Sequence, residues 1–280
     1  MDFLLRIFGY FLIFFLGAIF GSFLNAQAFR FLKPVSSKRS ICPRCGHSLS
    51  FLDLIPLFSY FLLLGRCRYC QKPISFQYLL MEFIMGFVFL LSFLFFLDAL
   101  NSNFWLGLFD LSYVLIIFSF LAVIFLVDLK KMIIPNKVVY PAILISLIYL
   151  LLKTIFFSFK GQFINFADSQ YNFGNFLTSA LASSFFFALI HFISRGKWLG
   201  FGDVKLIFLM GLFLGFPKIL AAIFIAFFSG GIIGLVLILL KKKEVKSEIA
   251  FGPFLVFGTF LAFFWGEKII NWYLSFFNFQ

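Results

Sequence analysis

The chain has 280 residues, of which 63% are hydrophobic and only 12% are charged, and its mean hydropathy is +1.08. This composition excludes a soluble globular protein and predicts a helical protein that crosses a membrane several times. In a soluble protein the formal net charge of +12 would suggest a nucleic-acid partner. In a membrane protein the positive charge serves topology and contact with anionic lipid, so we expect the lipid bilayer, and no nucleic acid, among the partners.

Apolar runs long enough to cross a hydrocarbon core of about 30 Å recur along the chain, and they predict an all-α polytopic fold with about eight transmembrane helices. The expected spans are 8–25, 79–98, 111–127, 138–157, 176–194, 204–216, 219–240 and 254–276. Only one sizeable polar element is visible, between the first two spans. We therefore expect a first transmembrane helix at 1–25, a small cytoplasmic domain at 26–78 and a seven-helix membrane domain at 79–280.

Lys and Arg residues are distributed unevenly between the expected loops. Eighteen of the 23 fall in four loops that lie on the same side of an eight-span alternation, at 26–78, 129–137, 195–205 and 241–250. Cytoplasmic loops of membrane proteins carry an excess of Lys and Arg. These four loops are therefore predicted to face the cytoplasm, and both termini the opposite side.

All four cysteines fall in the first of these loops, as Cys42-Pro-Arg-Cys45 and Cys67-Arg-Tyr-Cys70. Two C-x-x-C turns with 21 residues between them predict a closed tetrahedral zinc site, which is structural because no coordination position stays open. Disulfides are less expected in a reducing cytosol, and an unmetallated or redox-active set is the alternative. His47 is expected to be an exposed loop residue, since four cysteines already complete a site.

Two carboxylates lie at the cytoplasmic ends of expected spans. Asp128 follows a long apolar run in VDLKKMIIPN, and Asp203 follows two glycines in GFGDVKL. The alternation of spans puts both at the same membrane face, where they can form a pair. In such a pair one carboxylate accepts a proton from water while the other donates a proton to a carbonyl oxygen, as in aspartic proteases. For Asp128 alone, an ordinary helix-end charge is the alternative.

The segment FGPFLVFG, at 251–258, begins the last expected span. Gly252 and Pro253 either interrupt the helix and line a substrate groove, or form a plain turn into the helix with Pro in the tolerated first-turn position. The sequence leaves both open.

Six segments, in their order along the chain, resemble the landmarks of the type IV prepilin peptidase family. They are GSFLNAQAFR (21–30), the four-cysteine element, SFQYLLMEFIMG (75–86), VDLKKMIIPN (127–136), GFGDVKL (200–206) and FGPFLVFG (251–258). The resemblance implies a GxGD-type membrane aspartyl protease of the bacterial inner membrane, with Asp128 and Asp203 as the catalytic pair. The supporting motif residues would be Gly200, Gly202, Lys205, Gly252 and Pro253.

The resemblance also implies the substrates and a second activity. Expected substrates are type IV prepilins or pseudopilins, whose basic leader is cut after a glycine, and the acidic residues Asp53, Glu244 and Glu248 are candidate leader contacts. In many family members the new N-terminal residue is then methylated, with S-adenosylmethionine as the donor. The family associates this activity with the cysteine element, which points to Gly65, Arg66 and Glu82. For Glu82 the alternative is a helix-end acid paired with a Lys or Arg of that element.

Other functions remain as alternatives. Presenilin-like intramembrane proteases share the GxGD motif, but they carry Tyr-Asp and Pro-Ala-Leu where this chain has Val127-Asp128 and Phe251-Gly252-Pro253. A proton-coupled transporter with a zinc-binding domain would also use intramembrane acids, yet these aspartates are expected at one face rather than at the midplane. A purely structural assembly protein would leave them unexplained.

Overall fold

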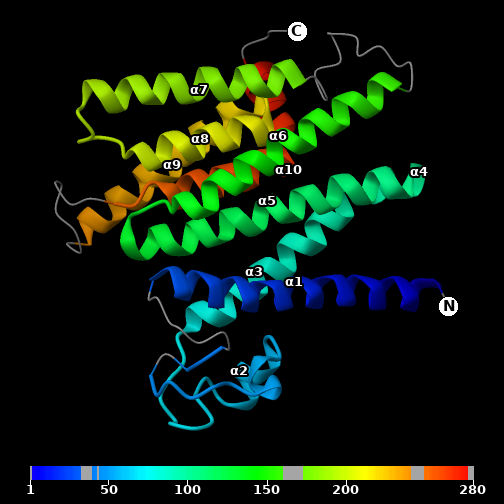
Figure 1. Cartoon of the computed structure of the whole chain (residues 1–280), viewed down its shortest axis with the longest axis vertical. Coiled ribbons are helices and arrows are strands. Elements are labelled where there is room, and N and C mark those ends of the chain that lie inside the picture. Colours follow the sequence, from blue (N-terminus) through cyan, green and yellow to red (C-terminus); the bar gives the residue numbers. More distant parts are fainter. Residues whose placement is uncertain (1, 33–39, 43, 160–172, 241–248, 277–280) are drawn as a thin grey trace. The chain divides into compact units, whose positions relative to one another are not determined.

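The computed structural model describes residues 2–32, 40–42, 44–159, 173–240 and 249–276. Within these ranges the chain is almost entirely helical (Figure 1), and its β pairing is limited to two isolated bridges, one between Ile41 and Ser48 and one between Arg66 and Pro73. The all-α fold predicted from the sequence is confirmed. The chain divides into two compact units, residues 1–119 and 120–280.

The first unit is a helical hairpin that carries the cysteine element between its two arms. The arms are α1 (Asp2–Leu32) and α3 (Phe76–Phe95), which pack along each other. The intervening segment contains the short helices η1 (Phe51–Leu54) and α2 (Phe58–Leu62). The unit is completed by α4 (Leu97–Ser102) and the first part of α5 (Phe104–Lys131).

Glycines let α1 and α3 approach closely. A Cβ atom at Gly17 would lie 2.5 Å from the carbonyl oxygen of Met85, and one at Gly21 would lie 2.8 Å from the Cα atom of Glu82. Gly86 of α3 faces α1 in the same way. Small residues spaced four apart are typical of tightly packed membrane helices. The contact therefore fixes the backbone of Glu82 against α1.

The first helix continues to Leu32, seven residues beyond the predicted end of the first span at 25. The sequence has no Gly or Pro between Gly21 and Pro34, so nothing local ends the helix at the edge of the apolar run. A tertiary contact holds the helix where this extension begins, because the side-chain amide of Asn25 donates to the carbonyl oxygen of Tyr78 at 3.2 Å.

The second unit is a helical bundle around α8. Besides the end of α5 it contains α6 (Asn136–Phe159), α7 (Phe173–Ile193), α8 (Phe201–Leu214), α9 (Lys218–Leu239) and α10 (Gly252–Phe276). α8 contacts α6, α7, α9 and α10, and α9 packs along α10. Most residues of α8 from Val204 onward are buried, which explains why its sequence is apolar on every side.

Within the described residues, seven helices are long and apolar enough to cross a membrane: α1, α3, α5, α6, α7, α9 and α10. The predicted span at 204–216 corresponds to α8, which has only 14 residues. At about 1.5 Å per residue it is roughly 21 Å long, shorter than a hydrocarbon core of about 30 Å. It ends because Gly215 adopts a φ of +67° and Pro217 follows.

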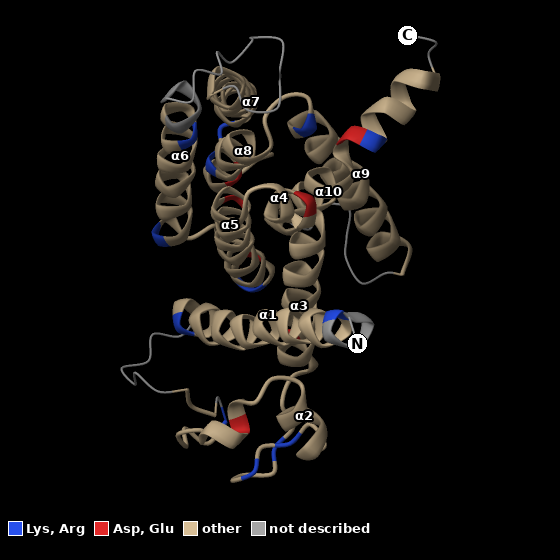
Figure 2. Cartoon of the chain, turned by 90° about the vertical axis from the view of Figure 1, so that its right-hand side faces the viewer, with Lys and Arg blue, Asp and Glu red and all other residues tan. Residues whose placement is uncertain are grey.

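Charged residues are sparse along the helices, and the cysteine element carries several basic residues (Figure 2). Arg30 lies in the last turn of α1, and Lys130 and Lys131 lie in the last turn of α5. Cations at helix C-termini are favoured by the helix dipole, and their long side chains can reach from the edge of the apolar run into water. The chain is a multi-pass membrane protein.

Candidate active site and metal centre

Asp128 lies in the last turn of α5, where the helix ends in a tight turn. The backbone N–H of Met132, a residue with a φ of 53°, donates to the carbonyl oxygen of Asp128 at 2.8 Å. Pro135 then leads directly into α6. The residue is only 3% exposed, and its carboxylate accepts a hydrogen bond from the backbone N–H of Gly252. The start of α10 is thereby placed beside Asp128.

Asp203 lies in the first turn of α8. Its Oδ2 atom accepts a hydrogen bond from the backbone N–H of Gly200 at 3.2 Å, so the side chain caps its own helix. The residue precedes the apolar run of α8 and lies outside the seven spanning helices. Burial, and after it the neighbouring Asp128 carboxylate, raises the pKa of Asp203 to about 7, against the opposing effect of the Gly200 hydrogen bond.

Both aspartates line one cavity of about 550 Å³ in the second unit. Its walls come from the end of α5, the turn before α6, the loop before α8, the start of α8 and residues 249–251 before α10. Ligand sites of enzymes commonly have volumes of about 300–1,000 Å³. The cavity is therefore large enough for a short stretch of peptide with a water molecule between the two carboxylates.

The two glycines of the GFGD segment serve close packing and capping. Gly200 is the N-cap residue of α8, and both glycines line the cavity. A Cβ atom at Gly202 would lie 3.0 Å from the Cβ of Ile134, in the turn after α5. The absence of a side chain at Gly202 therefore lets the start of α8 approach the turn that follows Asp128.

Lys205 does not form an ion pair with either aspartate within the described part of the chain. Its Nζ atom donates to the side-chain oxygen of Asn136 at 2.8 Å, and lies 5.3 Å from the ring centre of Tyr140 and 4.9 Å from that of Phe201. A cation held against two aromatic rings is stabilised by their electron-rich faces. Lys205 thus fastens α8 to α6 beside the cavity.

Gly252 and Pro253 form the first turn of α10, and both are buried. Phe251 lines the cavity, whereas neither Gly252 nor Pro253 does. A Cβ atom at Gly252 would lie 2.5 Å from Oδ2 of Asp128. The pair makes the plain turn into the helix, and the glycine is required because the Asp128 carboxylate occupies the space of a side chain.

The four cysteines are gathered in the first unit. The Sγ atoms of Cys42, Cys45, Cys67 and Cys70 all lie within 4.8 Å of one another. Tetrahedral zinc with Zn–S distances of about 2.3 Å requires sulfur atoms separated by roughly 3.8 Å. The residues present therefore fit a closed four-thiolate site.

The two C-x-x-C turns have the same backbone hydrogen bonds. The N–H of Cys42 donates to the carbonyl oxygen of His47 at 2.9 Å, and the N–H of Cys67 donates to that of Lys72 at 3.0 Å. Each turn also has a left-handed residue four positions after its first cysteine, Gly46 with φ 72° and Gln71 with φ 56°. This repetition supports a metal-binding arrangement. His47 is exposed, as predicted, and its ring lies 3.8 Å from that of Tyr69.

The three residues predicted for methyl transfer lie in different positions. Glu82 lines a second cavity, under the cysteine element, and forms no ion pair with a Lys or Arg among the described residues. Gly65 has a φ of +68°, and a Cβ atom there would lie 3.0 Å from the hydroxyl oxygen of Tyr60, which lines the same cavity. Arg66 is exposed and is not among the residues that line it.

Asp53 is not available for a leader peptide. Its side chain is only 3% exposed, and Oδ1 lies 3.0 Å from Nε of Arg68. Burial would raise its pKa, but hydrogen bonds from Ser50 and Tyr69 and the Arg68 charge hold the pKa of Asp53 below its ordinary value. Sequence reasoning missed this ion pair, since 15 residues separate its members. Glu244 and Glu248 lie outside the described residues.

Two family models match the chain. The bacterial peptidase A24 N-terminal domain matches residues 15–96, and the type IV leader peptidase family matches residues 115–235. No solved structure matches at a significant level.

Three curated relatives, each named prepilin leader peptidase/N-methyltransferase, are similar over most of their length. The protein of Aeromonas hydrophila is 31% identical over 237 residues, which cover 85% of this chain and 75% of the relative. That of Bacillus subtilis is 29% identical over 266 residues, 94% of this chain and 97% of the relative. That of Pseudomonas aeruginosa is 27% identical over 245 residues, 86% and 76% respectively.

Proposed function

Because this chain belongs to the type IV leader peptidase family, we propose that it removes the leader of type IV prepilins or pseudopilins through an aspartyl mechanism and then methylates the new N-terminus. The observation that carries the peptidase part is the shared cavity of Asp128 and Asp203. Three segments that are distant in sequence converge there: the end of α5, the start of α8 and residues 249–251 before α10.

The two aspartates divide the proton chemistry between them. With its pKa raised to about 7, Asp203 is protonated in roughly half of the molecules at neutral pH, and in this form it donates a proton to the scissile carbonyl oxygen. Asp128, which receives the Gly252 N–H, accepts a proton from the attacking water. The tetrahedral intermediate then collapses with departure of the amine of the mature protein. Two carboxylates that share one proton titrate as a pair, so these roles describe the pair in its singly protonated state.

The substrate has two parts with different environments. A hydrophobic helix of the mature protein lies in the bilayer, and the basic leader stays in water. The cavity opens among helix ends and loops, so it can receive the extended segment that joins the two parts. Helical peptides hide their carbonyl groups in hydrogen bonds, and the scissile bond therefore has to lie outside the substrate helix.

The orientation follows from charge. The basic residues at the end of α1, at the end of α5 and in the cysteine element fall in or next to loops that the positive-inside rule assigns to the cytoplasm. We infer that both aspartates and the cysteine element face the cytoplasm of a bacterial inner membrane. Labelling of single cysteines placed in the loops, with a reagent that does not cross the membrane, would test this orientation.

The second activity is assigned to the first unit. Zinc bound by the four cysteines would hold residues 40–75 together and would supply no reacting group, because its coordination sphere is closed. S-adenosylmethionine supplies an electrophilic methyl group when bound. The residues of this unit would bind the acceptor and position its amine.

One experiment tests both activities. A purified prepilin in detergent is incubated with the wild type, Asp128→Asn or Asp203→Asn, with and without S-adenosylmethionine, and intact masses are measured. We expect the wild type to remove the leader and, with the donor, to add a single methyl mass, and both folded variants to leave the leader in place. Cleavage by either variant at the wild-type rate would refute the aspartyl mechanism.

A further inference from the structure

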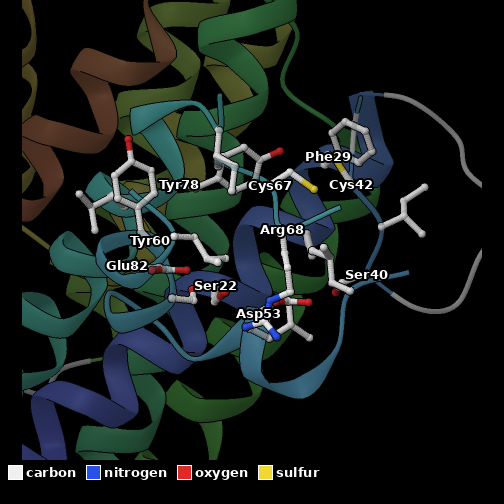
Figure 3. Close-up of a pocket in the computed structure, with 18 of the residues that line it drawn as sticks. Ser22, Phe29, Ser40, Cys42, Asp53, Tyr60, Cys67, Arg68, Tyr78 and Glu82 are labelled. Atoms are coloured by element: carbon white, nitrogen blue, oxygen red, sulfur yellow. The ribbon is translucent and has the colours of Figure 1, made fainter. Parts of the chain in front are cut away.

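The first unit has a cavity that the peptidase reaction does not use. It has a volume of about 140 Å³ and lies between the hairpin of α1 and α3 and the cysteine element. Figure 3 shows that Ser22, Tyr60 and Glu82 lie together in this cavity, and that Asp53 and Arg68 lie beside each other.

Glu82 contributes a buried carboxylate to this cavity. The residue is 8% exposed, and its Oε2 atom accepts the backbone N–H of Leu57 at 2.8 Å. The Ser22 hydroxyl donates a second hydrogen bond to the carboxylate. Within the described part of the chain no ion pair involves Glu82, whereas the charge of Asp53 is matched by Arg68. A carboxylate has about four acceptor positions, so capacity remains for a further donor.

The surroundings hold this carboxylate in place. Gly21 brings α1 against the backbone of Glu82, and the next residue of α1, Ser22, reaches the carboxylate. Leu57 presents its N–H from a backbone with φ 62°, a region that non-glycine residues rarely adopt. Sparsely populated backbone conformations cluster at ligand-binding positions. Three segments thus aim one anionic group at the cavity.

The size of the cavity restricts its occupant. Pockets for whole cofactors commonly exceed about 300 Å³, whereas an apolar cavity of about 150 Å³ in another protein holds one benzene molecule. The volume of about 140 Å³ is therefore suited to a single large apolar side chain. The large apolar side chains that line the cavity are those of Phe29, Ile41, Leu49, Leu54, Leu63, Ile74 and Leu79.

We propose that this cavity binds the first residue of the cleaved substrate, with the α-ammonium group on the Glu82 carboxylate and the apolar side chain among the surrounding apolar residues. The site would be the acceptor site for methyl transfer, and the inference rests on the methyltransferase activity proposed above. The peptidase reaction supplies the required chemical group, because hydrolysis of the leader peptide bond releases a new α-amine on a chain that stays in the membrane.

Glu82 acts as the proton acceptor in the methyl-transfer step. The α-ammonium group transfers one proton to the carboxylate, and the resulting amine lone pair attacks the methyl carbon of the sulfonium donor. The N–C bond forms as the C–S bond breaks, and the electron pair of the broken bond stays on sulfur, which becomes a neutral thioether. The product is a methylammonium group on the substrate.

Peptide binding tests the assignment directly. A fluorescent peptide that matches the mature N-terminus is titrated against the full-length protein in lipid nanodiscs, once with a free α-amine and once with an acetylated one. We expect the wild type to bind the free amine at least about tenfold more tightly than the acetylated form, because hydrogen bonds to a charged group are strong. Glu82→Gln keeps an oxygen that can accept the Leu57 N–H but removes the charge.

We expect this variant to lose the preference for the free amine while its leader cleavage is unchanged. Glu267→Gln, at an exposed glutamate of α10 that is ion-paired with Lys218 of α9, is the control and should behave as wild type. If Glu82→Gln binds both peptides as the wild type does, the acceptor site is elsewhere. If the variant weakens only S-adenosylmethionine binding, the cavity belongs to the donor and the proposal is wrong.

A larger side chain among the apolar residues of the cavity gives an independent test of the proposed side-chain pocket. Leu79→Phe should weaken binding of a peptide whose first residue is phenylalanine by about tenfold and leave a peptide that begins with alanine unaffected. Equal effects on the two peptides would contradict the proposed side-chain pocket. Absence of methyl transfer by the wild type, with amine-specific binding still dependent on Glu82, would refute the methyltransferase function and identify the cavity as a product-binding site.

Discussion

The two cavities of this protein are built in different ways. The aspartate cavity, in the second unit, is wide and lies among helix ends and loops, and each of its two aspartates accepts a hydrogen bond from the backbone N–H of a glycine. The cavity of the first unit is about a quarter as large and is lined mainly by apolar side chains around Glu82. The first arrangement suits a peptide backbone that passes through. The second suits the end of a chain. The difference predicts two reactions that mutations can separate.

The largest expected effect is the loss of leader cleavage when either aspartate of the pair is replaced. Asp128→Asn and Asp203→Asn should each lower the rate of leader cleavage at least about 10³-fold, because the proton transfers on both sides of the scissile bond are lost. Methylation of a peptide that already carries the mature N-terminus should continue. Both rates are measured by mass spectrometry, with the exposed Asp98→Asn as control. Loss of methylation along with cleavage would show that the two reactions share a site.

A substitution in the cysteine element should have the converse effect and remove methyl transfer. Cys42→Ser should abolish stoichiometric zinc, since metal binding supplies on the order of 10 kcal/mol to small sites of this type. The cysteine element should then become sensitive to proteolysis, and methyl transfer should be lost. Zinc is measured by atomic emission and the element by limited digestion. Retention of zinc at the wild-type level would contradict the four-thiolate site.

A single methyl group should damage the aspartate cavity. Gly252→Ala would place a Cβ atom 2.5 Å from Oδ2 of Asp128, so the carboxylate has to move, and leader cleavage should fall by about 10²-fold. Gly231→Ala in α9 is the matched control, because a Cβ atom there meets nothing within 4 Å. Equal activity of the two variants would show that Asp128 tolerates displacement.

The pH dependence should also differ between the two reactions. The pKa of Asp203 is raised to about 7, so its carboxyl group keeps the proton below that pH and loses it above. Leader cleavage should therefore decline above pH 7 and approach a tenfold loss per pH unit, whereas methyl transfer, in which Asp203 takes no part, should not follow this decline. Initial rates from pH 6 to pH 9 measure both. A cleavage rate that rises through this interval would exclude the protonated Asp203 as the acid.

The smallest expected effect concerns Gly65. Gly65→Ala forces a side chain into a left-handed conformation and against the Tyr60 hydroxyl, at a cost of about 1–2 kcal/mol. Methyl transfer should fall severalfold, with leader cleavage unchanged. Gly9→Ala, where a Cβ atom meets nothing within 4 Å, is the control. An effect on cleavage alone would reverse the assignment of the two units.

Much of the site could be predicted from the sequence because the motifs are local. The spacing of the two C-x-x-C turns indicates a metal site, and the position of the two aspartates at the ends of apolar runs indicates a carboxylate pair. Contacts between distant segments could not be predicted. The sequence places Lys205 in the motif of Asp203, but it gives no sign that the Lys205 side chain donates to Asn136, 69 positions earlier. The ion pair of Asp53 with Arg68 likewise depends on how the cysteine element folds.

Helix lengths were predicted less well than helix positions. Apolar content marks where a helix crosses lipid, but local stop signals decide where it ends. The first helix therefore runs past its apolar segment to Leu32, and α8 stops at Leu214, just before Gly215. The cavity around Glu82 had no sequence signal beyond a single acid in an apolar helix, since its walls come from three separate segments.

The close glycine contact between α1 and α3 has a consequence for how the protein is assembled. Once these helices have paired in the membrane, the segment between Leu32 and Phe76 is a closed loop with both ends held. For a loop of this length, the entropic cost of bringing the two ends together amounts to a few kcal/mol. Pairing of the two helices meets this cost before the cysteines bind a metal ion. Membrane insertion would thus be the first step in the maturation of the metal centre, and a mutation that loosened the hairpin would appear in a cell as a defect in zinc loading.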